Sequence, residues 1–167
     1  NLTCDSMFVD SPKDIMIAYG NANVWDTTYS LVADTLFYFS ELDSGSANGQ
    51  ATLIQKKQII KGDRIEYKDI PDVDGVSYAA RGNVTITEEG RIATCGEAIY
   101  DRENSNTILR INPEIIDDNQ TIAGSEIYLN YNDDLLESLF IPSNAHATHP
   151  SKGIRERIKI VEQDTTI

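Results

Sequence analysis

The sequence predicts an all-β protein: an elongated β-jellyroll (β-taco) of stacked antiparallel strands with open edges at both ends. Three observations predict this fold. Apolar and polar residues alternate over long segments rich in Ile, Val, Thr and Tyr, helix signals are nearly absent, and a unit of about 30 residues repeats along the chain. A chain of 167 residues has the size of one ordinary domain. We therefore expect a single domain over 1–167, which begins in mid-repeat as a part of a longer protein.

Several long segments alternate as half-buried strands do. The clearest are 14–25, 58–67, 76–87, 107–116 and 121–131. Clusters of Gly, Asp, Asn, Ser and Pro predict turns between the strands, at 43–46, 71–75, 88–90 and 117–119. The only candidate for a helix is the short segment 133–138, and its sequence pattern favours a non-helical structure over a helix.

The repeat units start near residues 20, 49, 82, 111 and 143. The first four open on GNANV (20–24), GQATL (49–53), GNVTI (82–86) and INPEI (111–115), and a partial fifth opens on SNAHA (143–147). Thirteen positions after each of the first four starts stands a small residue: Ala33, Gly62, Cys95 and Gly124. The apolar positions before and after that residue differ in parity, so a bulge or bend is needed to return both to one face. Each unit is therefore expected to form two bent strands over one apolar interior.

The repeat also predicts which side chains face that interior. Their functional interpretation is a groove that binds lipid acyl chains, and the alternative for most of them is plain core packing. These candidate site residues are Val24, Leu31, Leu36, Tyr38, Leu53, Ile60, Ile65, Tyr67, Ile86, Ile115, Ile122, Ile127 and Leu129.

The charge excludes some classes of partner. The chain has 14 Lys and Arg against 27 Asp and Glu, a formal net charge of −13. A protein this acidic is unsuited to nucleic acid or to docking on an anionic membrane through charge alone. No apolar run approaches the length of a transmembrane segment. The basic residues Lys56, Lys57, Lys61, Arg64 and Lys68 cluster, and on one strand face they would meet lipid phosphates or an acidic partner; a solvated hairpin tip is the alternative.

The sequence carries no catalytic motif: neither a nucleophile elbow, a phosphate-binding loop nor a zinc-protease signature is present. We expect no enzymatic activity, no catalytic residue and no cofactor. We also expect no metal, because His146 and His149 have opposite parity on a strand and lack a third ligand, and Asp72-Val73-Asp74-Gly75 lacks the rest of a calcium loop. Cys4 and Cys95 occupy equivalent positions three units apart, which predicts two unpaired thiols.

The units Ala33-Asp34-Thr35-Leu36-Phe37-Tyr38, Gly62-Asp63-Arg64-Ile65-Glu66-Tyr67 and Gly82-Asn83-Val84-Thr85-Ile86 resemble the OstA-like repeats of the LptA family of lipopolysaccharide-transport proteins. The resemblance covers residues 4–149. It implies a periplasmic β-jellyroll whose groove carries the acyl chains of lipopolysaccharide, and which joins other Lpt-type jellyrolls end to end through edge strands. It does not separate the soluble bridge, an LptC-like protein or the amino-terminal domain of LptD.

Two further classes of function stay open from the residues. One is a structural or adhesive β-repeat protein with a filled core and no lipid ligand. The other is an enzyme on a different kind of β-jellyroll. The lipid carrier and the structural protein are separated by one property, whether the interior is open.

Overall fold

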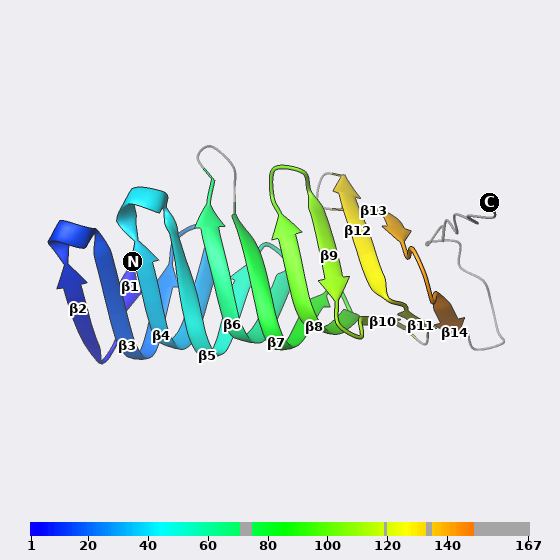
Figure 1. Cartoon of the computed structure of the whole chain (residues 1–167), viewed down its shortest axis with the longest axis horizontal. Coiled ribbons are helices and arrows are strands. Elements are labelled where there is room, and N and C mark those ends of the chain that lie inside the picture. Colours follow the sequence, from blue (N-terminus) through cyan, green and yellow to red (C-terminus); the bar gives the residue numbers. More distant parts are fainter. Residues whose placement is uncertain (71–74, 119, 133–134, 149–167) are drawn as a thin grey trace.

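The computed structural model describes residues 1–70, 75–118, 120–132 and 135–148, and most of these lie in strands (Figure 1). Two 3-10 turns, η1 (Ser11–Lys13) and η2 (Ser40–Leu42), are the only helical elements described. The strands are β1 (Leu2–Thr3), β2 (Ser6–Asp10), β3 (Ile15–Trp25), β4 (Tyr29–Phe39), β5 (Ser44–Gln55), β6 (Gln58–Asp69), β7 (Val76–Glu88), β8 (Arg91–Asp101), β9 (Asn106–Arg110), β10 (Glu114–Asp117), β11 (Gln120–Ala123), β12 (Glu126–Asn132), β13 (Leu135–Phe140) and β14 (His146–Thr148). The predicted all-β class is confirmed.

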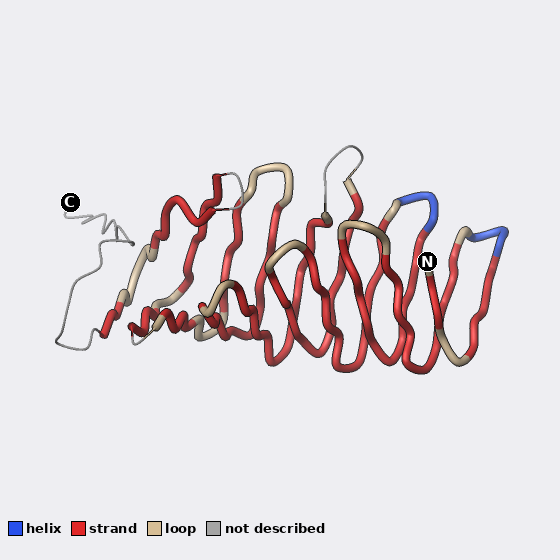
Figure 2. The backbone as a smooth tube through the Cα atoms, turned by 180° about the vertical axis from the view of Figure 1, so that it is seen from behind, coloured by secondary structure: helices blue, strands red, loops and turns tan. Residues whose placement is uncertain are grey.

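The strands form one antiparallel sheet that folds lengthwise into two layers. What we call the β2 layer runs β2-β3-β4-β5-β6-β7-β8-β9-β12-β13, and the β1 layer runs β1-β3-β4-β5-β6-β7-β8-β10-β11-β14. The six long strands β3 to β8 belong to both layers because each one bends between them. Seen from either side, these bends line one long side of the molecule and give it the shape of a trough (Figures 1 and 2). The sheet is open, as predicted, and its edge strands in the described part of the chain are β1, β2, β13 and β14.

The bends occur where the repeat places them. The pairing of β3 with β4 skips between Tyr19 and Ala22, so Gly20 and Asn21 lie outside the regular register. Both of these residues have positive φ, 72° and 45°, which turns the strand sharply and suits Gly and Asn better than other residues. The same register shift recurs at each following pair up to β7 and β8. The predicted bend is therefore confirmed: the register shifts lie beside the small residues Ala33, Gly62 and Cys95 and at the opening glycines of the first three units.

An aspartate from the neighbouring segment of the sheet covers each of the first three corner glycines, Gly20, Gly49 and Gly82. A Cβ atom added to Gly82 would lie 2.3 Å from Asp63 Oδ2, and the corresponding distance from Gly49 to Asp34 Oδ2 is 2.2 Å. The Asn83 side-chain amide donates a hydrogen bond to Asp63 Oδ2 at 2.9 Å. The carboxylate thus fills the space that the missing side chain leaves, and holds the bend together.

In the fourth unit the two roles are exchanged. Gly96 stands where the earlier units have aspartate, and Ile111 stands where they have glycine. The Ile111 side chain occupies the space beside Gly96, where an added Cβ would lie 2.7 Å from the Ile111 Cβ. A main-chain hydrogen bond also joins this corner: the Gly96 N–H donates to the Ile111 carbonyl oxygen at 2.9 Å. Large and small residues are therefore matched across every one of these corners.

Two segments that were predicted as single strands are each divided into two strands. Segment 107–116 is two strands, β9 and β10, because Ile111 and Asn112 adopt positive φ and Pro113 has no N–H to donate. Segment 121–131 likewise divides into β11 and β12, which join different layers. Within the helix candidate 133–138, the described residues from 135 onward are strand β13. Residues 71–74, 119, 133–134 and 149–167 lie outside the described residues. They include His149, most of the turn candidate 71–75, and all of the calcium-loop candidate except Gly75.

Candidate functional site: a compartment between the two layers

The predicted interior positions do face the space between the layers. Leu31, Leu53, Ile60, Ile65 and Ile127 are fully buried, and most of the remaining candidates are nearly so. Val24 and Tyr38 are exceptions, because they are only half-buried. Both stand near the β1 and β2 end of the sheet, so the interior is less well filled there than in the middle. Burial by itself does not distinguish a lipid-binding wall from ordinary core, and their lipid-binding role stays a prediction.

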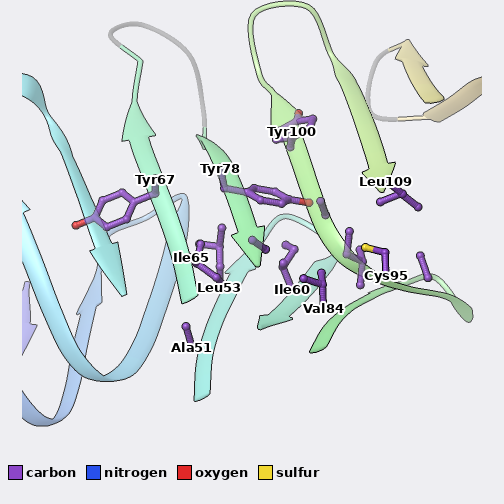
Figure 3. Close-up of a cluster of buried hydrophobic side chains, with 14 of the residues drawn as sticks. Ala51, Leu53, Ile60, Ile65, Tyr67, Tyr78, Val84, Cys95, Tyr100 and Leu109 are labelled. Carbon is purple, nitrogen blue, oxygen red and sulfur yellow. The ribbon is translucent and has the colours of Figure 1, made fainter. Parts of the chain in front are cut away.

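The middle of the molecule is tightly packed. The rings of Tyr78 and Tyr100 lie 5.4 Å apart between centroids, and Figure 3 shows both within the apolar cluster. The cavity beside Tyr78, which Ile86, Ile115 and Leu129 help to line, has a volume of only about 10 Å³. That is close to the space of a single water molecule. At this point the interior has no room for an acyl chain.

A hydrogen bond joins the two layers across their open side. Gln55, at the end of β5 in the β1 layer, accepts a bond at 3.0 Å from the backbone N–H of Val76, which begins β7 in the β2 layer. Both residues are buried, so the bond is shielded from water. It marks where the two layers close on each other.

Replacement of Gln55 by methionine is expected to destabilise the fold by about 1 to 3 kcal/mol. Methionine has a similar shape but offers no oxygen acceptor, so the buried N–H of Val76 is left unpaired. Denaturant unfolding measures the change. Gln58→Met is the control, since the Gln58 amide bonds to Glu88 on a half-buried part of the structure; an equal loss in both variants would contradict a special role for the Gln55 bond.

Toward the β1 and β2 end, the two layers enclose a cavity of about 380 Å³, which we call the compartment. Its size falls in the range of small-molecule sites. The lining residues include Leu2, Met16, Val24, Trp25, Asp26, Tyr29, Leu36, Tyr38, Asp43, Tyr67 and Asp69. Beyond it, Met7 and Val9 on β2 are opposite the inward-facing Ala18 and Met16, yet they are 52% and 57% exposed. The interior is therefore uncovered at this end.

Two tyrosines that line the compartment flank Gly45. Gly45 pairs with Tyr38 on one side and Tyr67 on the other, and a Cβ added to it would lie 2.6 Å from the Tyr67 hydroxyl oxygen. The Tyr67 ring extends over this glycine, away from Tyr78 (Figure 3). It meets the ring of Tyr29 from the other layer at a centroid distance of 6.3 Å. These two tyrosines connect the layers at the inner part of the compartment.

Three carboxylates stand among these lining residues. The Asp26 carboxylate is exposed, and although partial burial acts in the other direction, hydrogen bonds from Thr28 and Tyr29 lower its pKa. Burial, together with the nearby charges of Asp26 and Asp43, raises the pKa of Asp69. The Tyr38 hydroxyl donates to Asp43 at 3.2 Å. The compartment thus combines an apolar and aromatic wall with a concentration of negative charge.

Burial also raises the pKa of the tyrosines. The pKa of Tyr29 rises to about 12, first because the ring is desolvated and then because Asp69 and Asp26 are close. The pKa of Tyr67 is raised for the same first reason. Both hydroxyls are therefore neutral near pH 7 and act as hydrogen-bonding groups without charge.

Sequence reasoning found part of this compartment. Four of the predicted interior residues line it: Val24, Leu36, Tyr38 and Tyr67. It missed Met16 and the aromatic residues Trp25 and Tyr29, which flank the first hairpin turn. Met16 was accessible to the same reasoning, because it shares a cross-strand row with Tyr38. The acidic residues come from turns and strand ends, where the repeat carries no signal.

The basic cluster does not form one surface. Lys61 lies in the β1 layer, paired with Thr52 and Thr85, whereas Arg64 follows the bend and lies in the β2 layer. Arg64 bonds to Glu66 at 2.8 Å, and Arg81 bridges Glu66 to Glu97. The expectation of a single basic strand face is wrong, because the bend within β6 separates its members.

Both cysteines are free thiols. Burial raises the pKa of Cys95 to about 11, so at pH 8 its reactive thiolate is scarce. We expect the native protein to react slowly with a thiol reagent at Cys95, and the denatured, unreduced protein to show two thiols. Titration with Ellman's reagent measures both quantities. Detection of no thiol after denaturation would contradict the unpaired assignment.

Within the described residues, no group of three or more His, Cys, Asp or Glu side chains is placed to hold a metal ion. Among the same residues, no helix has the length and apolar character needed to cross a membrane. His146 is exposed on β14.

The chain was compared with known proteins. No family model matches its sequence. No curated protein matches it either. Among solved structures, it is similar to the crystal structure of LptH, the LptA homologous periplasmic component of the lipopolysaccharide transport device of Pseudomonas aeruginosa, with 11% identity and a TM-score of 0.38 over 90% of this chain and 94% of that one. A likeness this distant carries no argument about what the chain binds. The functional conclusion therefore rests on the compartment.

Proposed function

We propose that this chain is a non-enzymatic carrier domain for an acylated lipid of the lipopolysaccharide type. The compartment between the layers, open toward the β1 and β2 end, is the observation that supports this function. The resemblance of the repeats to the OstA-like family supplies the lipid class and the periplasm as its location. The acyl chain lies between Val24, Leu36 and Met16, with the aromatic residues around it.

The energetics favour such a ligand. Each methylene group removed from water contributes about 0.8 kcal/mol, so about six buried methylenes contribute roughly 5 kcal/mol. The compartment needs no general acid, base or metal for this role, because binding of the tail is a matter of apolar area. The closed middle of the molecule sets a limit to how far the tail enters.

The same proposal includes end-to-end assembly through edge strands. β2 pairs with β3 alone in the described structure, and its Met7, Phe8 and Val9 are each more than half exposed. An apolar edge of this kind adds a strand from another sheet readily. The partners that fit are the far edges of similar jellyrolls.

Phe8→Lys is expected to reduce self-association, because a lysine on an edge strand opposes strand addition. Light scattering across a range of concentrations measures the effect. Leu42→Lys is the control: Leu42 is 64% exposed but belongs to the turn η2. Association that is equally weak, or equally strong, in both variants would contradict assembly through β2.

Native mass spectrometry and equilibrium binding with purified lipopolysaccharide and with a saturated fatty acid test the carrier function. We expect one bound lipid per chain, and a change in the fluorescence of Trp25, the single tryptophan of the sequence, as the tail enters. A protein that binds neither probe would contradict the proposal.

A structural or adhesive β-repeat protein is the second candidate. The tightly packed middle around Tyr78 and Tyr100 favours it, since a filled interior needs no ligand. The absence of binding in the experiment above is the result that this function predicts.

A further inference from the structure

The small cavity in the middle of the molecule is bordered by polar atoms that lack partners. In the described part of the chain, three buried side-chain atoms have no hydrogen bond: the Tyr78 hydroxyl oxygen, the Thr107 hydroxyl oxygen and Arg91 Nε. The side chains that carry them all line the same cavity of about 10 Å³. Because buried polar groups in folded proteins nearly always have partners, three such atoms at one cavity indicate a bound group.

The two hydroxyls are shut off from solvent. Tyr78 is 3% exposed and Thr107 is 2% exposed. The Tyr78 ring extends from β7 toward β8 and carries its hydroxyl into the interior (Figure 3). Burial raises the pKa of Tyr78 well above its usual value, so this hydroxyl keeps a proton that needs an acceptor.

The neighbouring side chains do not supply these partners. Burial raises the pKa of Tyr131 and the nearby Thr107 hydroxyl acts in the opposite direction, but no hydrogen bond of normal geometry joins the two. Arg91 Nε lies 3.5 Å from Asp117 Oδ2, and Arg91 Nη1 lies 3.5 Å from Glu88 Oε2. Both of these approaches are long for a hydrogen bond. The three atoms therefore have hydrogen-bonding capacity that the surrounding protein leaves unused.

We propose that one water molecule is bound in this cavity, where it bridges the hydroxyls of Tyr78 and Thr107 and accepts a third bond from Arg91 Nε. A volume of about 10 Å³ is at the lower limit of what one water needs, and internal waters typically make about three hydrogen bonds. Water both donates and accepts, which suits two hydroxyls and an N–H. An anion is disfavoured, because the Glu88 carboxylate also lines the cavity.

The bound water joins the two layers. Tyr78 on β7 and Thr107 on β9 belong to the β2 layer, whereas Arg91 begins β8 in the β1 layer. β8 is also the strand at which the sheet divides, since it pairs with β9 in one layer and with β10 in the other. The closed middle is thus held by a hydrogen-bonded junction as well as by apolar contact. The inference is independent of the proposed function, because the water keeps these partners whether or not a lipid occupies the compartment.

A high-resolution crystal structure tests the site directly. We expect one water peak at about 2.7 to 3.2 Å from both hydroxyl oxygens. A cavity without density, or a direct bond between the two hydroxyls, would overturn the proposal. In solution, oxygen-17 relaxation dispersion counts long-lived internal waters. The double variant Tyr78→Phe, Thr107→Val is expected to have one fewer than the unchanged protein, and an equal number in both would also overturn the proposal.

Stability variants show whether the two hydroxyls share a partner. Tyr78→Phe and Thr107→Val each remove one hydroxyl at nearly constant shape and leave the water short of a bond. Each is expected to lower the melting temperature by about 3 to 8 °C. The double variant is expected to lose clearly less than the sum, because the water then leaves together with both hydroxyls.

Thr85→Val is the matched control for this cycle. Thr85 is half-buried on the outer face of β7, between the inward-facing Val84 and Ile86. Its effect is expected to add to that of Tyr78→Phe, because the two side chains share no partner. Losses from Tyr78→Phe and Thr107→Val that are equally additive would overturn the shared water.

Discussion

Replacement of Val24 by tryptophan is expected to abolish lipid binding, with a loss of affinity of at least tenfold. Val24 lies on β3, is half-buried and lines the compartment. An indole at this position occupies the space that the acyl chain needs, so fewer methylenes of the tail leave water. The cavity has room for the larger ring, because its volume is about 380 Å³ and it is uncovered at one end. Equilibrium binding of a fatty acid, together with a melting curve, separates lost affinity from lost folding.

The matched control is Val32→Trp. Val32 lies on the neighbouring strand β4, where it pairs with Asn23 of β3. Its side chain faces outward and is 39% exposed. The same substitution there adds the same ring without entering the compartment. Unchanged binding in Val24→Trp, or equal loss in both variants, would contradict the assignment of the binding site.

Replacement of Gly82 by alanine is expected to give the largest loss of stability, about 3 kcal/mol or more. Gly82 has a φ of 73°, and a left-handed conformation costs an L-residue about 1 to 2 kcal/mol. The added methyl group also meets the Asp63 side chain at 2.3 Å and displaces its bond with Asn83. Overpacking of this kind costs about 1 to 3 kcal/mol more. Thermal unfolding is expected to shift down by roughly 6 to 12 °C.

Gly90→Ala separates the two contributions. Gly90 also has positive φ, 91°, but nothing lies within 4 Å of an added Cβ. It is expected to lose only about 1 to 2 kcal/mol, the backbone cost alone. The double variant Asp63→Gly, Gly82→Ala is expected to recover part of the loss, because the fourth unit pairs Gly96 with Ile111 in the same way. No recovery in the double variant would contradict the matching of residue size across the corners.

The bends of the fold were predictable because the repeat encodes them in residue types. Glycine at the start of each of the first three units signals positive φ, and the change in parity at Ala33, Gly62 and Cys95 signals the register shift. The division of 107–116 was less visible. Ile111 takes the place of the corner glycine there, so the usual signal is absent, and the apolar pattern continues through the break.

The location of the compartment was not predictable from the same pattern. All repeat positions of one kind, such as Tyr38 and Tyr67, look equivalent in sequence, and only the structure shows that Tyr67 reaches across Gly45. The width of the space between the layers also depends on pairs that the repeat does not describe, such as Gln55 with Val76. The tyrosine pair of Tyr78 and Tyr100 fills the middle, whereas among the described strands none lies beyond β2 to cover that end.

The central claim is that an acyl chain lies between the two layers at the β1 and β2 end, and photo-crosslinking tests it most directly. A diazirine-bearing aliphatic residue is placed at Leu36, which is 4% exposed and lines the compartment, or at Phe37, the next residue of β4, whose side chain faces the other side of the sheet. The account predicts that bound lipopolysaccharide or fatty acid crosslinks to position 36 and not to position 37. Crosslinking at position 37 alone, or equally at both positions, would contradict it.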